Sequence, residues 1–204
     1  MPKPALNDIE NLFEKLVLPF YQLERDLPLP IDNHRNETDA EHSWSLALLA
    51  CALAPHIDPK LDIGQVCQFA IVHDLVEVYA GDVSVWAANE QHQAKKANEA
   101  KALKKLEQSF AKFPWVIETV RRYEAKDSDE AQFVNSIDKF AALLVLYKDK
   151  GFYYHRGKIT KARFEKQFAP HRKKAHVHAG AANYYEKIRQ AFDAHPEYFY
   201  RAKP

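Results

Sequence analysis

The stretch TDAEHSWSLALLACALA, residues 38–54, decides the fold class of this chain. Thr38 followed three places later by Glu41 is a capping box, in which each side chain bonds a backbone amide that the first helical turn leaves unpaired. The apolar side chains that follow recur at helical spacing. The stretch therefore predicts a helix from Asp39 to Ala54, with His42 close to its start.

The next helix is predicted from Ile63 to Ala80. Asp62 can cap its first turn, and Gly81 follows its last residue at the position that tolerates left-handed backbone. Three reactive side chains fall near the end of this helix: His73, Asp74 and Glu77.

The rest of the chain also has helical periodicity. Asp127 or Ser128 can cap a strongly apolar helix from Glu130 to about Lys148, with Asp138 in its middle. Further helices are predicted at residues 7–23, 89–110, 115–125, 161–168 and 179–194. Residues 26–36 contain two prolines and no periodicity, so they predict an ordered loop, as do the aromatic and basic residues after Gly151.

Length and composition favour one helical domain. The chain has 204 residues, of which 47% are apolar, and this suffices for one compact core. Only five glycines occur, which suits helices better than a turn-rich sheet protein. We therefore predict an all-α, single-domain bundle over residues 1–204.

Charge and cysteine usage exclude some protein classes. The net charge of +1 argues against a surface built throughout for nucleic acid, so no nucleic-acid partner is expected. Cys51 and Cys67 lack the close spacing of a redox or zinc motif, and two reduced thiols in a cytoplasmic protein are expected. Residues 1–11 do not resemble a signal peptide, and no apolar run approaches the roughly 20 residues of a membrane span.

Four side chains with metal-ligand chemistry fall on the predicted helices: His42, His73, Asp74 and Asp138. Asp138 has apolar residues three and four places away, so it is expected to be buried, where a lone carboxylate would cost several kcal/mol unless paired or metal-bound. His73 and Asp74 diverge by about 100° around a helix, yet one ion beside that helix can be reached by both. The His-Asp pair alone is a weak signal, because it arises often by chance in a chain with ten histidines.

Several stretches together resemble the HD-domain metal-dependent phosphohydrolases, most closely their 5′-deoxynucleotidase branch. The stretches are RNETDAEHSWSLALLA (35–50), HDLVEVYAGDVS (73–84), KKANEAKAL (95–103) and YEAKDSDEAQFVNSIDKFAALL (123–144). The resemblance implies an HD-type bundle with a motif core at about 35–144 and a C-terminal helical extension at about 151–204. It also implies a homodimer that releases inorganic phosphate from nucleoside 5′-monophosphates, above all 2′-deoxynucleotides.

The resemblance implies that His42, His73, Asp74 and Asp138 together hold a divalent ion. Two imidazoles and two carboxylates suit Mn²⁺, Fe²⁺, Co²⁺, Ni²⁺ or Zn²⁺ better than Ca²⁺. Four ligands around an ion that prefers six leave about two positions for a water and a phosphate oxygen. Only His92 lies between the His-Asp pair and Asp138, so we predict one ion, without an organic cofactor.

Other roles in the site follow from the resemblance and have plainer alternatives. Glu77 lies one turn beyond the first residue of the His-Asp pair and can orient or deprotonate the attacking water, or can simply be solvated. Asp82 would contact the sugar and assist catalysis, or merely shape the turn after Gly81. Arg35 would offer its planar fork to the phosphate, or lie at the surface. Lys95 and Glu99 are secondary substrate-binding candidates that could equally form an ordinary ion pair.

Some features depart from the family pattern or stay ambiguous. Related proteins often carry a proline shortly after the residues matching Gly81 to Val83, whereas this chain reads Ser84-Val85-Trp86. The segment HRKKAHVH, residues 171–178, is predicted as a solvated loop rather than a nucleic-acid site. Five aromatic residues could fill the core or line a nucleotide pocket: Trp44, Trp86, Phe152, Tyr153 and Tyr154.

Three other functions are compatible with the same residues. A phosphodiesterase or pyrophosphohydrolase for cyclic or alarmone nucleotides would use the same metal site. A non-catalytic nucleotide-binding module would have lost a ligand or Glu77, and here every position is present. A purely structural helical protein would bind no stoichiometric metal.

Overall fold

The computed structural model describes residues 3–87 and 89–201. In chain order its elements are α1 (Leu6–Leu12), the π-helical segment η1 (Phe13–Val17), α2 (Leu18–Gln22), β1 (Glu24–Leu29), β2 (Asp32–Thr38), α3 (Asp39–Ile57), α4 (Ile63–Val72), α5 (Glu77–Ala80), α6 (Asn89–Ser109), α7 (Pro114–Ala125), α8 (Asp129–Lys148), α9 (Phe152–Arg156), α10 (Lys161–Ala175), α11 (Ala179–Ala191) and the 3₁₀ turns η2 (Phe192–Ala194) and η3 (Pro196–Tyr198). Apart from one short hairpin, the described part of the chain is helical, and the all-α prediction is confirmed.

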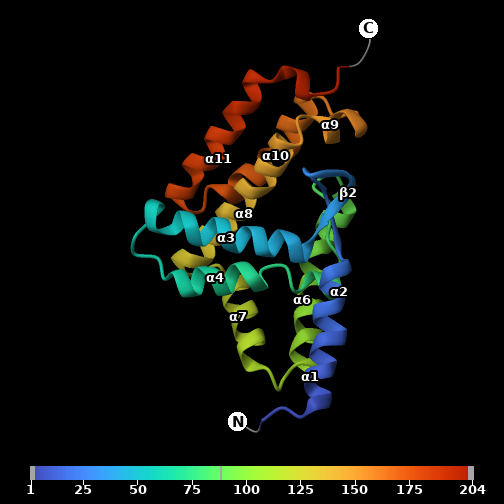
Figure 1. Cartoon of the computed structure of the whole chain (residues 1–204), viewed down its shortest axis with the longest axis vertical. Helices are drawn as coiled ribbons and strands as arrows, with labels where there is room; N and C mark the ends of the chain where they lie inside the picture. The colour runs from blue at the N-terminus through green and yellow to red at the C-terminus, as the bar shows by residue number, and fades with distance from the viewer. Residues whose placement is uncertain (1–2, 88, 202–204) are drawn as a thin grey trace.

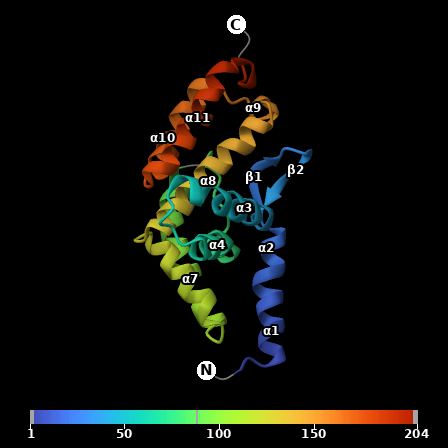
Figure 2. The ribbon, with the colours of Figure 1, turned by 60° about the vertical axis from the view of Figure 1, so that its left-hand side comes forward.

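Helices α3 and α4 lie side by side at the middle of the molecule, and the long helix α8 crosses them (Figure 1). One end holds α9, α10, α11 and the C-terminus, and the opposite end holds α1, α7 and the N-terminus (Figures 1 and 2). The first core cluster lies where α3, α4 and α8 meet. A second cluster joins the last turns of α8 to the C-terminal helices, and a third joins the α4–α5 region to α6 and α7.

The predicted helix starts are confirmed at three places. The Thr38 hydroxyl accepts from the Glu41 amide at 3.3 Å, and the Glu41 carboxylate accepts from the Thr38 amide at 2.9 Å, which completes the capping box of α3. Asp62 accepts from the Gln65 amide at 3.1 Å and begins α4. Ser128 accepts from the Ala131 amide at 3.2 Å and begins α8.

The prediction of a loop at residues 26–36 is wrong, because these residues lie in the antiparallel hairpin of β1 and β2. Glu24 pairs with Thr38, Pro28 with Asn36 and Leu29 with Asp32, with irregular register between these pairs. Proline is tolerated here because both strands of a two-stranded ribbon are edge strands. The short, irregular pairing also explains why no clean alternation marked the strands in the sequence.

The helix predicted from Ile63 to Ala80 is interrupted. Helix α4 ends at Val72, residues 73–76 form tight turns with i to i+3 bonds such as Glu77 N to Asp74 O (2.8 Å), and α5 follows. The Nδ1 atom of His73 lies 2.9 Å from the Ala70 carbonyl oxygen, which an unbroken helix would offer to the Asp74 amide. The side chain of His73 thus replaces the backbone bond that would have continued the helix.

The C-terminal loops predicted from the sequence are also shorter than expected. Residues 152–156 form α9, and α10 continues to Ala175, so most of the segment 171–178 is helical and His178 caps α11 by accepting from the Ala181 amide. The burial of Tyr153 and Tyr154 in the second core cluster explains why residues 152–156 form a helix rather than a solvated loop. Trp44, in contrast, is 69% exposed, so the default expectation that it fills the core is wrong.

Candidate metal centre

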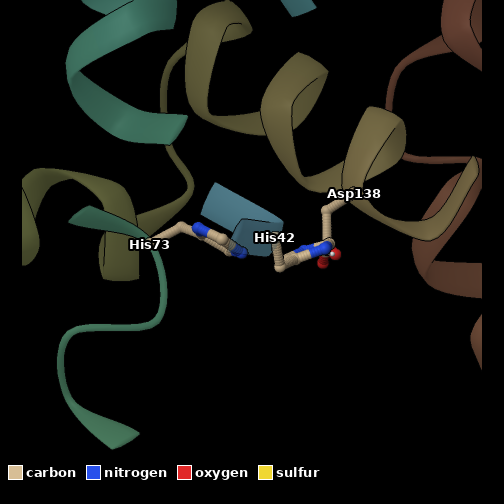
Figure 3. A group of neighbouring side chains, drawn as sticks. All are labelled: His42, His73 and Asp138. Atoms are coloured by element: carbon tan, nitrogen blue, oxygen red, sulfur yellow. Dashed lines mark hydrogen bonds and ion pairs between the residues drawn. The ribbon is translucent and has the colours of Figure 1, made fainter. Parts of the chain in front are cut away.

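Three buried ligands meet where α3, α4 and α8 cross. His42 comes from the start of α3, His73 is the C-cap residue of α4, and Asp138 lies in the middle of α8. Their side chains converge from three separate elements (Figure 3), and one ligand atom of each lies within 4.8 Å of the others. The Nε2 atom of His42 is 3.1 Å from Oδ1 of Asp138, and the two imidazole centroids are 5.2 Å apart.

Each histidine is oriented by a neighbour on its far ring nitrogen. The Nδ1 atom of His73 faces the Ala70 carbonyl oxygen, so its Nε2 points into the cluster. The Nδ1 atom of His42 is 3.3 Å from the Glu37 carboxylate, which leaves Nε2 for Asp138. Partners of this kind fix the ring orientation and tautomer of metal-binding histidines.

Asp74, the fourth predicted ligand, lies beside His73, but its ligand atom groups with those of Asp39 and Glu77 rather than with the other three ligands. Its Oδ2 atom is 2.9 Å from Nε2 of His73, a buried nitrogen that has no partner in hydrogen-bonding geometry. The buried, unpartnered Nε2 atom of His73 fits a metal ligand, whereas Oδ2 of Asp74 also accepts from Nη1 of Arg25 at 2.6 Å. The donor set of two imidazoles and two carboxylates therefore suits a divalent transition-metal ion.

The charges of the cluster also favour a cation. Burial raises the pKa of Asp74 and of Asp138. Interactions with His73 and Arg25 outweigh burial for Asp74, and interactions with Lys139 and His42 outweigh it for Asp138, so both pKa values fall below the ordinary range. Burial and the charge of Arg25 lower the pKa of His42, but hydrogen bonds with Asp138 and Glu37 outweigh them and raise it to about 9. A proton on His42 thus balances carboxylates that a metal ion could balance instead.

A second acidic group lies beside the first and was not expected from the sequence. Ligand atoms of Asp39, Asp74 and Glu77 lie within 4.8 Å of one another. Arg25 of β1 bridges this group, with Nη1 at 2.6 Å from Asp74 and 3.1 Å from Asp39. Arg25 was missed because no strand was predicted around it, and Asp39 was placed correctly at the start of the predicted helix but not recognised as part of the site. An assignment of β1 as a strand would have turned Arg25 toward one face and Asp26 toward the other.

Glu77 and Lys95 meet at the edge of this acidic group. Glu77 is 5% exposed, and its Oε1 atom is 3.2 Å from the ammonium group of Lys95, which is also 3.6 Å from Glu99. Burial and the charge of Asp74 raise the pKa of Glu77 to about 10, against the lowering effect of Lys95. The structure thus brings together the predicted catalytic glutamate and both secondary candidates.

The two remaining predicted residues lie in different surroundings. Asp82 follows Gly81, whose φ of +78° matches the predicted left-handed position, and its negative charge contributes to raising the pKa of Asp39 and Glu77. Asp82 therefore lies within electrostatic range of the acidic group. Arg35 forms a two-point ion pair with Glu41, at 2.6 and 2.8 Å, on the exposed side of β2. Its role at the phosphate stays a prediction.

The comparisons with known proteins agree with this arrangement. The family model of the HD domain matches residues 24–179, which include all four predicted ligands. The chain belongs to the HD domain family. This HD domain is 28% identical over 112 residues to the human 5′-deoxynucleotidase HDDC2 and 27% identical over 110 residues to the mouse protein of that name. It spans about half the length of these curated relatives, 53% in each case.

Solved structures share the fold of this HD domain over nearly the whole chain. A protein of Magnetospirillum magnetotacticum MS-1, named a predicted metal-dependent phosphohydrolase, aligns with a TM-score of 0.74 and 23% identity, over 95% of this chain and 96% of that one. The PH0347 protein of Pyrococcus horikoshii OT3 aligns with a TM-score of 0.61 and 25% identity, over 93% and 99%. Across residues 3–87 and 89–201, no helix is long and apolar enough to cross a membrane.

Proposed function

We propose that this HD domain is a metal-dependent phosphohydrolase that releases inorganic phosphate from nucleoside 5′-monophosphates, with 2′-deoxynucleotides as the preferred class. The observation that carries the proposal is the convergence of His42, His73 and Asp138 from three helices, with Asp74 against His73, in a buried site. The names of the HDDC2 relatives support the nucleotide class. The homodimer implied by the resemblance stays a prediction.

The four ligands would hold one divalent ion. When bound, such an ion polarises a phosphoryl oxygen and lowers the pKa of a water from 15.7 toward about 7. The protein's contribution would be to hold two neutral imidazoles and two ionised carboxylates in fixed positions in a largely buried site, with no rearrangement needed at the moment of reaction.

Glu77 is the group that we assign to the attacking water. Its carboxyl group is buried beside Asp74, and a cation held by the four ligands would offset the negative charge of Asp74, which helps to raise the pKa of Glu77, and would thus favour the carboxylate form that a base needs. Lys95, at 3.2 Å, holds its Oε1 atom in place, while its Oε2 atom is buried without a partner. A carboxyl oxygen with an unused position beside the ligands can accept the proton of a water as it attacks phosphorus.

The cations around the acidic group are suited to a phosphate ester. Arg25 is 12% exposed and bridges Asp39 and Asp74 through one nitrogen, Nη1. A guanidinium group offers paired N–H donors that match phosphate oxygens. We assign the phosphate end to Arg25, with Arg35 as the outer candidate, and the sugar end to Asp82.

The test is metal analysis followed by phosphate release. Protein purified without added metal is analysed for its elements, reloaded with each of Mn²⁺, Fe²⁺, Co²⁺, Ni²⁺ and Zn²⁺, and assayed on nucleoside 5′-monophosphates. We expect one ion per chain and orthophosphate from 2′-deoxynucleotides ahead of ribonucleotides. Turnover of cyclic nucleotides or alarmones alone would replace the monoesterase by a phosphodiesterase or pyrophosphohydrolase. Binding without turnover would make the chain a nucleotide-binding module.

A further inference from the structure

The loop that carries Asp82 is fastened to parts of the chain outside the metal centre. The Ser84 hydroxyl donates to the Asp26 carboxylate of β1 and accepts from the Trp86 amide at 3.1 Å. The Ala87 amide bonds the Ser84 carbonyl oxygen at 3.0 Å, which closes a turn over residues 84–87. The loop is thus tied to the strand that also supplies Arg25.

The C-terminal helices hold the same loop from the other side. The Gln167 side chain of α10 donates to the Val85 carbonyl oxygen. The Trp86 ring packs against Phe168 with centroids 5.8 Å apart, and the Arg163 guanidinium lies 5.1 Å from the ring centre. These contacts join the Asp82 loop to α10.

Tyr153 of α9 joins the two sets of contacts. It is 5% exposed, and its hydroxyl lies close enough to Asp26 and Trp86 for both side chains to affect its pKa. Burial is the main cause that raises the pKa of Tyr153, and Asp26 raises it further, so the hydroxyl keeps its proton. Ser84 bonds Asp26 directly and Tyr153 lies beside the same side chain, so one partly buried group of side chains connects β1, the Asp82 loop and α9.

We propose that Asp26, Ser84 and Tyr153 are positioning residues that hold the Asp82 loop against the metal centre and thereby set the preference for the sugar of the nucleotide. We call these three residues the clamp, and each of their side chains can be substituted separately to test its contribution. This inference rests on the proposed function, because the sugar is read by Asp82 only in a nucleotide substrate.

Tyr153 and Tyr154 provide a matched pair of variants. Both are buried in the second core cluster, but the Tyr154 hydroxyl has no hydrogen-bond partner. Tyr153→Phe removes a hydroxyl of the clamp, and Tyr154→Phe removes a neighbouring hydroxyl that holds nothing. Ser84→Ala removes the second contact to Asp26, and Ser84→Thr restores a hydroxyl at that position.

In metal-loaded protein, Tyr153→Phe and Ser84→Ala should raise KM for a 2′-deoxynucleoside 5′-monophosphate about two- to tenfold, the ratio that one ordinary hydrogen bond represents. The ratio of kcat/KM for deoxy over ribo substrate should fall by a similar factor, while kcat and metal content hold. Tyr154→Phe and Ser84→Thr should match the wild type. Equal KM and sugar ratio in Tyr153→Phe and Tyr154→Phe overturn the proposal.

Amide hydrogen exchange tests the positioning independently of activity. The amides of Trp86 and Ala87 should exchange faster in Tyr153→Phe and Ser84→Ala than in the wild type, and Tyr154→Phe should leave them unchanged. Unchanged exchange in all variants overturns the clamp. A wild type that exchanges as expected but hydrolyses no nucleoside monophosphate overturns the proposed function and the sugar preference, while the clamp stands.

Discussion

The metal-centre region and the C-terminal region place their charges differently. In the metal-centre region, formed by the hairpin, α3, α4, α5 and the middle of α8, six charged or imidazole side chains are buried: Glu37, Asp39, His42, His73, Glu77 and Asp138. In the C-terminal region, formed by the end of α8, α9, α10 and α11, the core is mostly aromatic, and rings such as Tyr154, Phe164 and Phe192 pack in edge-to-face or tilted pairs. Most charges of α10 and α11 lie on the surface.

This difference separates a region that stabilises the fold, the C-terminal region, from a region whose buried charges serve a site, the metal-centre region. Eight buried polar side-chain atoms in the described residues have no hydrogen-bond partner, and six of them lie in the metal-centre region. Unpaired buried polar atoms lower the stability of a protein, and they persist mainly where function needs them. The aromatic core of the C-terminal region offsets that cost with large buried apolar area.

The largest effect that we predict distinguishes two buried aspartates, one in the middle of α8 and one at its C-cap. Asp138→Asn should remove one ligand charge, abolish metal retention and lower kcat by about 10⁴-fold or more. Asp149→Asn makes the same change in the C-terminal region, where Oδ2 of Asp149 accepts from the Tyr153 amide at 2.6 Å. It should keep metal and turnover. Elemental analysis and phosphate release measure both, and metal retention in Asp138→Asn would contradict the ligand assignment.

Glu77→Gln should lower kcat by about 10² to 10⁴, because a positioned acid–base group is lost while the shape of the side chain is kept. The metal content should stay at the wild-type level, which distinguishes this variant from Asp138→Asn. Steady-state kinetics on the reloaded protein provide the measurement. Near-normal turnover would show that Glu77 does not act on the water.

Phe164→Ala should leave the metal centre intact and weaken the fold. The ring is 1% exposed and packs against Tyr154, Phe168, Phe192 and Phe199. Removing a buried phenylalanine costs about 3–5 kcal/mol of unfolding free energy. Urea unfolding followed by circular dichroism gives the change, and a loss below 1 kcal/mol would show that this cluster is not the main stabiliser.

The smallest predicted effect concerns pH and the ion pairs between α10 and α11. Burial raises the pKa of Glu186, but Arg172, His176 and Arg189 outweigh it and lower the pKa to about 2. Since the folded-state pKa is depressed, Glu186 contributes stability above about pH 4.5, and the contribution is lost as the pH falls toward 2. Glu186→Gln should therefore cost at most about 1 kcal/mol at pH 7, because solvent screens the pairs. Thermal unfolding should show the difference shrinking between pH 5 and 3.

Most helix positions were accessible from the sequence because their signals are local. The Thr38 capping box and the Ser128 cap mark helix starts by residue type and spacing, and the apolar neighbours of Asp138 correctly predicted its burial. Arg25 carries no such mark. Its place beside the acidic group depends on the hairpin, whose pairing is short and irregular and leaves no periodic signal.

The end of α4 at Val72 could also not be predicted from the spacing of apolar residues. Residues 73–76 keep helix-like dihedrals, so apolar spacing continues through them, and only the contact of the His73 ring with the Ala70 carbonyl oxygen interrupts the ladder. Side chains that compete for backbone carbonyls are seen only once their partners are placed. The exposure of Trp44 is another nonlocal property.

The tight turns at residues 73–76 also limit how this HD domain could be engineered. A protein designer who wants a higher melting temperature would find them an attractive target for strong helix formers. A tight turn has fewer residues per turn than an α-helix, so regularising these four residues would rotate Glu77 relative to His73. The same substitutions that favour a continuous helix would therefore move Glu77 away from Asp39 and Asp74.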